Sequence, residues 1–129
     1  MKVLILVLCL VWSGVSFAKT DCSNESNYGD VSLAEMQKIA TEKSAVILDV
    51  NSRNSFTKER IGNAVHFGAN KNQLAKVLPK DKSAAIVAYC GGPSCGAWKR
   101  AAVAACKMGY KNIRHFSEGI TGWKPPKKG

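Results

Sequence analysis

The sequence predicts an α/β domain with a parallel sheet that helices cover on both faces. Three short apolar runs, over 45–50, 64–67 and 84–89, end in polar residues and have the composition of buried parallel strands. Helical segments separate these runs, and a last strand is expected around Ile113. Strands that alternate with helices in this way form a parallel sheet. Such sheets bind their ligands outside the carboxyl ends of the strands, so we expect the functional site there.

The helix with the clearest signal spans 33–42. Ser32 and Glu35 have the spacing of a capping box at its start. The apolar residues that follow recur on one helical face, which predicts an amphipathic helix that packs on the sheet. Three further helices are expected over 55–60, 71–78 and about 96–108, the second stopped by Pro79 and the third ended by Gly109.

The first residues have the pattern of an export signal. Lys2 is followed by an apolar run over 3–12 and by small residues before Ala18, which predicts a signal peptide over 1–18. The run is about half the roughly 20 residues that a membrane anchor needs. We therefore expect a periplasmic or secreted protein without membrane contact after cleavage. Residues 19–30 are polar and turn-rich, and they are expected to form a flexible arm before a domain over 31–129.

The chain is strongly basic, with 19 Lys and Arg against 9 Asp and Glu, a net charge of +10. Because the lysines are scattered and the protein is expected outside the cytoplasm, nucleic acid is not an expected partner. The charge should instead raise the local concentration of small anions such as thiosulfate, polysulfide or phosphate.

Four cysteines remain after the predicted cleavage: Cys22, Cys90, Cys95 and Cys106. In an oxidising compartment an even number is consistent with two disulfides in any of three pairings. Cys106 is expected in the core, and Cys22 as a loose thiol or as a partner in an external disulfide. The spacing of Cys and His does not resemble a zinc site, so neither a metal nor an organic cofactor is expected.

The segment 84–96 carries the chemistry, because an apolar strand ends there in Cys90 and a glycine-rich loop leads into a helix. The amides of such a loop converge on the sulfur, and the helix adds its positive end, so both stabilise a thiolate. Cys90 is therefore predicted to be the catalytic nucleophile; the alternative is a buried structural thiol. The predicted substrate-binding loop consists of Gly91, Gly92, Pro93, Ser94, Cys95 and Gly96, of which all but Pro93 carry an amide hydrogen.

These residues, taken in order with others, resemble the rhodanese-like domain family over 31–123. The matching features are Ile47-Leu48-Asp49-Val50, Phe56, Ile61 with Ala64, Tyr89-Cys90, Gly109-Tyr110, and Gly119-Ile120 with Trp123. The resemblance implies a five-stranded parallel sheet with flanking helices. It also implies that Cys90 takes sulfur from a donor and passes it to a nucleophilic acceptor.

The sequence departs from the family pattern at several positions. Asn51 stands where an Arg commonly follows Asp-Val, Arg60 stands where a His usually precedes the Ile, and Gly62-Asn63 replaces the usual Pro-Gly. The segment between Cys90 and Gly109 is also longer than in common members and carries a second thiol, Cys95. These departures leave the donor specificity open.

Several residues are predicted to support the site. Asp49 ends a strand, where a carboxylate can hold loop amides, and a general-base role is the less favoured alternative. Trp98 either lines the pocket or packs in the core, and Lys99 and Arg100 lie near enough to attract an anionic donor. Cys95 is either a resolving thiol for Cys90 or a thiol tucked against the helix start.

The function expected from these features is sulfur transfer. A Cys90 persulfide would carry sulfur from thiosulfate or polysulfide to a thiol, cyanide or sulfite, and a protein could be the sulfur acceptor or a redox partner. The alternative is a non-catalytic or redox-sensing module that uses Cys90 and Cys95 as a dithiol-disulfide pair. A Cys-dependent phosphatase is disfavoured, because Gly96 stands where such enzymes place the Arg that clamps phosphate.

Overall fold

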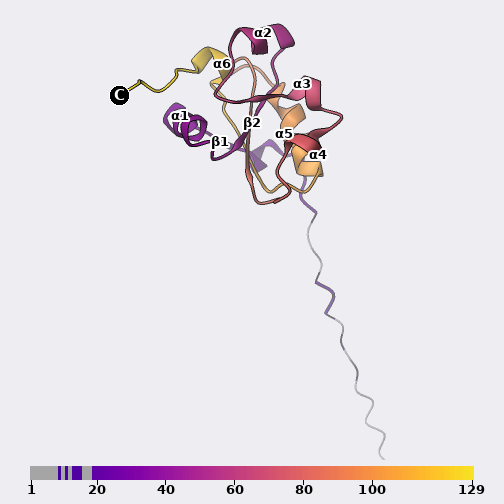
Figure 1. Ribbon diagram of the computed structural model, residues 1–129. Coiled ribbons are helices and arrows are strands. Elements are labelled where there is room, and N and C mark those ends of the chain that lie inside the picture. Colours follow the sequence, from indigo (N-terminus) through magenta and orange to yellow (C-terminus); the bar gives the residue numbers. More distant parts are fainter. Residues whose placement is uncertain (1–8, 10, 12, 16–18) are drawn as a thin grey trace, which may run out of the picture.

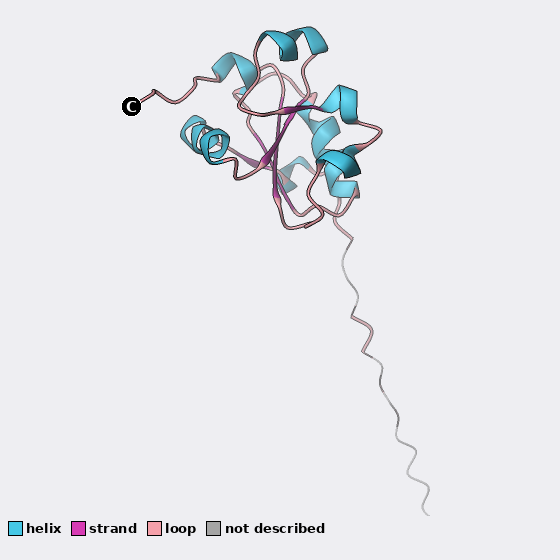
Figure 2. Ribbon diagram, in the orientation of Figure 1, coloured by secondary structure: helices cyan, strands magenta, loops and turns pink. Residues whose placement is uncertain are grey.

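A five-stranded, all-parallel sheet forms the centre of the protein (Figures 1 and 2). The computed structural model describes residues 9, 11, 13–15 and 19–129. The predicted fold class is confirmed. In chain order the strands are β1 (Gly29–Asp30), β2 (Val46–Asp49), β3 (Val65–His66), β4 (Ala85–Tyr89) and β5 (Asn112–His115), and across the sheet they lie in the order β1-β5-β4-β2-β3.

Helices cover both faces of this sheet (Figure 1). The helices are α1 (Leu33–Glu42), α2 (Arg53–Lys58), α3 (Phe67–Asn70), α4 (Leu74–Val77), α5 (Trp98–Lys107) and α6 (Gly119–Gly122), and a short 3-10 helix, η1 (Glu25–Asn27), precedes β1. α1 lies on one side of the sheet, whereas α4 and α5 lie on the other.

The central strand β4 divides its side chains between two hydrophobic cores. Ile86 and Ala88 pack in the core under α5, and Val87 and Tyr89 pack in the core under α1. All four are almost fully buried, because successive strand residues point to opposite faces and both faces are covered. This explains why the strand is apolar at every position.

The predicted helices are present, with differences at their ends. The side chain of Ser32 accepts a hydrogen bond from the amide of Glu35 at the start of α1, as the capping pattern predicts. The segment expected as one helix over 71–78 is helical only in α4, and α3 precedes it with His66 as its cap. α6 was not predicted, since four residues are too few to show a hydrophobic period.

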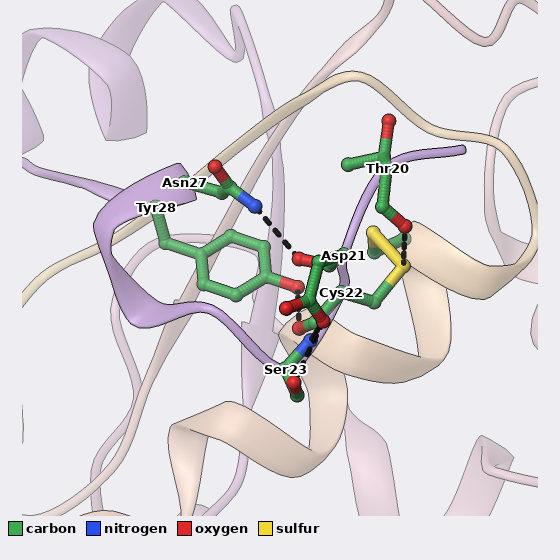
Figure 3. Close-up of a disulfide and its surroundings, with 7 residues drawn as sticks. Thr20, Asp21, Cys22, Ser23, Asn27 and Tyr28 are labelled. Carbon is green, nitrogen blue, oxygen red and sulfur yellow. Dashed lines mark hydrogen bonds between the residues drawn. A yellow bond between two sulfur atoms is a disulfide. The ribbon is translucent and has the colours of Figure 1, made fainter. Parts of the chain in front are cut away.

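Residues 19–30 are attached to the domain, contrary to the flexible arm that the sequence predicts. β1 extends the sheet through β5, and Tyr28 is only 6% exposed. A disulfide joins Cys22 to Cys106 on α5, so Cys22 is neither a loose thiol nor part of an external disulfide. Cys106, which was expected in the core, is partly buried and packs against the core under α5. Figure 3 shows how the segment folds around Cys22. The hydroxyl of Tyr28 donates to the backbone carbonyl of Cys22, and the side-chain amide of Asn27 donates to the backbone carbonyl of Asp21.

The predicted signal peptide falls largely on residues outside the described part of the chain, namely 1–8, 10, 12 and 16–18. Within the described part, none of the helices has both the length and the apolar character needed to cross a membrane.

Candidate functional site

Cys90 directly follows β4, at the carboxyl edge of the sheet where the sequence predicts the site. The residue is only 3% exposed. The neighbouring strand β2 ends at the same level, because Asp49 is in register with Tyr89. The loop from Gly91 to Ala97 then leads into α5. The nucleophile predicted from sequence therefore stands at the end of the central strand.

The short helix α6 holds the first residues of this loop. The amide of Ile120 donates to the carbonyl of Cys90 at 2.9 Å. The carbonyl of Gly91 accepts two hydrogen bonds from Thr121, one from its amide at 3.1 Å and one from its hydroxyl at 2.9 Å. Both backbone carbonyls after β4 are thus fixed from one side.

Gly119 allows α6 to approach this closely. Its φ is +62°, and a Cβ there would lie 2.6 Å from the backbone carbon of Gly91 and 2.7 Å from the carbonyl oxygen of Cys90. A side chain at this position would therefore collide with the backbone of the loop. Gly92 is packed similarly, since a Cβ there would lie 2.9 Å from the hydroxyl of Thr121.

The second half of the loop turns back toward Cys90. The amide of Cys95 donates to the carbonyl of Gly92 at 3.0 Å, which closes a turn over Pro93 and Ser94. The turn brings the two cysteines together, with their Cα atoms 6.3 Å apart, and a disulfide joins them. The amide of Cys95 is therefore occupied by the turn, in contrast to the expectation that it forms part of an anion cradle.

Asp49 ties the ends of the strands together. It is fully buried, and its two carboxylate oxygens accept hydrogen bonds from the amide of Asn51 and from the hydroxyl of Tyr89. The same hydroxyl accepts a hydrogen bond from the amide of Ile61. Burial raises the pKa of Tyr89, and the hydrogen bond to Asp49 raises it further, so this hydroxyl stays protonated. Asp49 therefore holds the backbone of Asn51 directly and that of Ile61 through the hydroxyl of Tyr89.

Asn51 takes the position where family members commonly carry Arg, and it lies beside the loop. Its side-chain oxygen is 3.8 Å from the place where a Cβ of Gly91 would stand, and its carbonyl is 2.8 Å from Nε2 of His66. Its side-chain nitrogen is buried and finds no hydrogen-bond partner among the described residues. The side-chain oxygen of Asn51 thus faces Gly91, while its side-chain nitrogen is a buried donor without a partner in the described chain.

A cavity of about 260 Å³ opens beside the second half of the loop. Cys95 lines it, together with Trp98 and His115. The rings of Trp98 and His115 are stacked 3.9 Å apart, and Tyr28 packs edge-on against Trp98. Burial lowers the pKa of His115, whose Nδ1 has no hydrogen-bond partner within the described chain. The other lining residues are Glu25, Pro93, Ser94, Gly96 and Lys99.

The two basic residues predicted to attract a donor differ in their surroundings. Lys99 forms an ion pair with Glu25 at the cavity, while its side chain stays 41% exposed. Arg100 is exposed on α5 and does not line this cavity. Glu25 therefore competes with any anion for the charge of Lys99.

A larger cavity of about 990 Å³ lies around the Cys22–Cys106 disulfide, near the last turn of α5. Lys19, Lys107 and Lys111 contribute to its walls. Neither Cys90 nor Cys95 lines it, so its size does not make it the reactive site.

Sequence reasoning missed three residues of the site: Glu25, His115 and Thr121. Glu25 belongs to a segment without a hydrophobic period, and His115 was expected only as a core or rim histidine. Thr121 follows the Gly119-Ile120 pair that carries part of the family resemblance, and that pair was the only available signal for α6. Each of the three reaches the site through a contact with a residue distant in the chain: Glu25 with Lys99, His115 with Trp98, and Thr121 with Gly91.

The family model of the rhodanese-like domain matches residues 32–125. The chain belongs to the rhodanese-like domain family. The match includes Cys90, its loop and α6. These elements therefore belong to the rhodanese-like domain, which has a sulfurtransferase-type fold. It begins after β1, so η1 and the Cys22 side of the disulfide lie outside the matched region.

Solved structures of low sequence identity share this fold. A protein from Bacillus halodurans is 22% identical with a TM-score of 0.62, and the match covers 77% of this chain and 73% of that one. A single-domain sulfurtransferase from Saccharomyces cerevisiae is 13% identical with a TM-score of 0.59, over 74% of this chain and 88% of that one. A rhodanese-related protein from Thermoplasma volcanium is 20% identical with a TM-score of 0.54, over 74% and 90%. No curated protein matches the sequence.

Proposed function

We propose that this rhodanese-like domain is a sulfurtransferase that carries sulfane sulfur as a persulfide on Cys90. The observation that carries the proposal is the position of Cys90, directly after the central strand, in a loop whose backbone α6 holds from one side. One protein of similar fold is a single-domain sulfurtransferase, which supports the same chemistry.

The proposed reaction has two steps. The Cys90 thiolate first attacks the outer sulfur of thiosulfate; a bond forms between that sulfur and Cys90 Sγ, and the sulfur–sulfur bond of the donor breaks. The electron pair leaves with sulfite. A thiol, cyanide or sulfite then attacks the outer sulfur of the persulfide, and Cys90 returns as a thiolate. Such covalent intermediates divide one transfer into two simpler steps.

An anionic donor fits the charge of the protein. The net charge is +10, and Lys99 lies at the cavity beside the loop. Positive charge raises the rate at which small anions reach a site. Thiosulfate and polysulfide are therefore the proposed donors, in the periplasm or outside the cell, where the predicted signal peptide would direct the chain.

A second candidate is a redox-sensing module, which the disulfide between Cys90 and Cys95 favours. In this function the two thiols are oxidised together, and no sulfur is transferred. The two candidates differ in what happens to reduced Cys90 when it meets a sulfur donor, because only the transferase gains a sulfur atom.

Mass spectrometry of the reduced protein after brief exposure to thiosulfate or polysulfide tests the proposal. Trypsin releases residues 83–99 as one peptide that contains Cys90 and Cys95 but neither Cys22 nor Cys106. In a Cys95→Ser variant, this peptide is expected to gain one sulfur, about 32 Da, that cyanide removes. The Cys90→Ser variant is the control and should gain nothing at this peptide. A cyanide-labile gain that persists in Cys90→Ser would overturn the role of Cys90.

A further inference from the structure

We propose that the protein reduces the outer sulfur of its donor to sulfide, with Cys90 and Cys95 as a reducing pair that an external dithiol restores. This inference rests on the persulfide of the proposed function and assigns the fate of its sulfur. In this route the sulfur leaves the protein as sulfide, in competition with its transfer from Cys90 to an external acceptor.

The first support is the position of Cys95 relative to the inner sulfur of a persulfide. That inner sulfur is Cys90 Sγ itself, the atom to which Cys95 Sγ is joined in the structure. The turn closed between the carbonyl of Gly92 and the amide of Cys95 holds the second cysteine in this place. A Cys95 thiolate in this loop is therefore directed at Cys90 Sγ. When a bond forms between the two cysteine sulfurs, the outer sulfur of the persulfide is displaced from Cys90 Sγ.

The step balances without an external oxidant. The Cys95 thiolate attacks Cys90 Sγ, a bond forms between the two cysteine sulfurs, and the bond from Cys90 Sγ to the outer sulfur breaks. The electron pair leaves on the outer sulfur, which takes one proton from water and departs as hydrosulfide. The outer sulfur is reduced, and the two cysteine thiolates are oxidised to the disulfide. Such exchange is the ordinary chemistry of thiolates with sulfur–sulfur bonds.

The second support is the difference in exposure between the two thiols. Cys90 is 3% exposed, and α6 holds its carbonyl, whereas Cys95 is half-buried and lines the open cavity with Trp98. An external acceptor therefore meets Cys95 before it reaches a persulfide on Cys90. The internal thiol is also held in position, which makes its attack effectively unimolecular.

The same difference in exposure assigns the restoring step. A thiolate of the external dithiol attacks Cys95 Sγ from the cavity, and the electron pair of the broken bond returns to Cys90 as a thiolate. The second thiol of the reductant then displaces Cys95, so that the reductant leaves as its own disulfide. The partner required is thus a dithiol, because a single thiol would remain attached to Cys95 until another thiol arrived.

The experiment follows sulfide and peptide mass together in one turnover. The full chain is reduced, freed of reductant, and mixed with an equimolar amount of thiosulfate. Wild type is expected to release about one sulfide per chain, and peptide 83–99 should lose about 2 Da as its internal disulfide forms. Cys95→Ser and Cys95→Ala should release no sulfide before reductant is added and should keep the gain of about 32 Da. The Cys22→Ser/Cys106→Ser variant lacks two other thiols of the reduced chain, and its yield should still be about one sulfide per chain, because neither residue lines the cavity at Cys95.

The outcomes separate this inference from the proposed function. If wild type keeps the sulfur on peptide 83–99 and releases no sulfide, the inference is wrong and the persulfide stands. If the sulfur is found on Cys95 in wild type, attack at the outer sulfur has occurred, which also overturns the inference. If neither Cys95 variant gains sulfur, the proposed persulfide itself fails.

Discussion

Gly119 is the residue at which the site leaves no room for a side chain. A Gly119→Ala variant would place a Cβ against the backbone of Gly91 and Cys90 in a left-handed conformation. We expect the free energy of unfolding to fall by about 1–3 kcal/mol. Sulfur loading of Cys90 should fall about tenfold or more, since small displacements of reacting groups slow catalysis strongly. Urea unfolding and loading rates measure the two effects.

A matched control for this change is Gly29→Ala on β1, where a Cβ would meet only the side chain of Arg114 at 3.6 Å or more. That variant should load sulfur at the wild-type rate. Equal loading by Gly119→Ala and wild type would show that the contact with α6 does not set the geometry of the loop.

His115 makes the stability of the protein depend on pH. Burial lowers its pKa from 6.5 and Lys99 lowers it further, while the charges of Asp30 and Glu25 act in the opposite direction. The unfolded chain therefore binds the proton more tightly than the folded protein does. The free energy of unfolding should fall as the pH drops below about 6.5, and the fall should end below the lowered pKa.

Replacement of His115 tests this pH dependence. The His115→Gln variant should lose less stability than wild type between about pH 7.5 and pH 5.5. Glu35, whose pKa the hydrogen bond from Arg114 lowers, contributes stability that is lost only at more acidic pH, below its ordinary value of 4.5. Parallel stability curves for the two proteins over this interval would contradict the assignment to His115.

At the scale of elements, the segment over residues 19–30 contributes Glu25 to the wall of the cavity that Cys95 lines. The Cys22–Cys106 disulfide and the Tyr28 hydroxyl hold this segment, and Glu25 reaches Lys99 at the cavity. The loop closed by this disulfide is long, with a sequence separation of 84. Cross-links over long loops restrict the unfolded chain most strongly.

Removal of this disulfide is therefore expected to destabilise the protein. The Cys22→Ser/Cys106→Ser variant should lose about 2–4 kcal/mol of unfolding free energy under oxidising conditions. Denaturant unfolding measures the loss. The free energy of unfolding of wild type, treated with a reductant that opens this disulfide, should approach that of the variant. Unchanged stability would mean that residues 19–30 are held by their noncovalent contacts alone.

At the scale of the whole molecule, the net charge of +10 acts on every anionic substrate. The second-order rate constant for thiosulfate should fall as ionic strength rises from about 0.02 M to 0.5 M, because salt screens the long-range attraction. A neutral organic trisulfide should react at a rate that changes little over the same range. Equal salt dependence for both donors would show that the charge does not guide the donor.

The sequence by itself determined the α/β class, the three apolar strands, the helices α1 and α5, and the place of Cys90. These features depend on patterns within a few residues, such as the capping pair Ser32 and Glu35 or the apolar run that ends at Cys90. A local pattern predicts a helix or strand because the residues that form the pattern lie within that same helix or strand.

Only the tertiary structure decided how distant segments meet at the site. β1 has two residues and takes its partner from β5, and Cys22 pairs with a cysteine 84 positions away. Glu25 contacts Lys99 and Thr121 contacts Gly91, and no pattern in the residues around Glu25 or Thr121 predicts these contacts. The physical reason is that these contacts connect short elements whose own sequences carry no period, and packing against the completed sheet selects them.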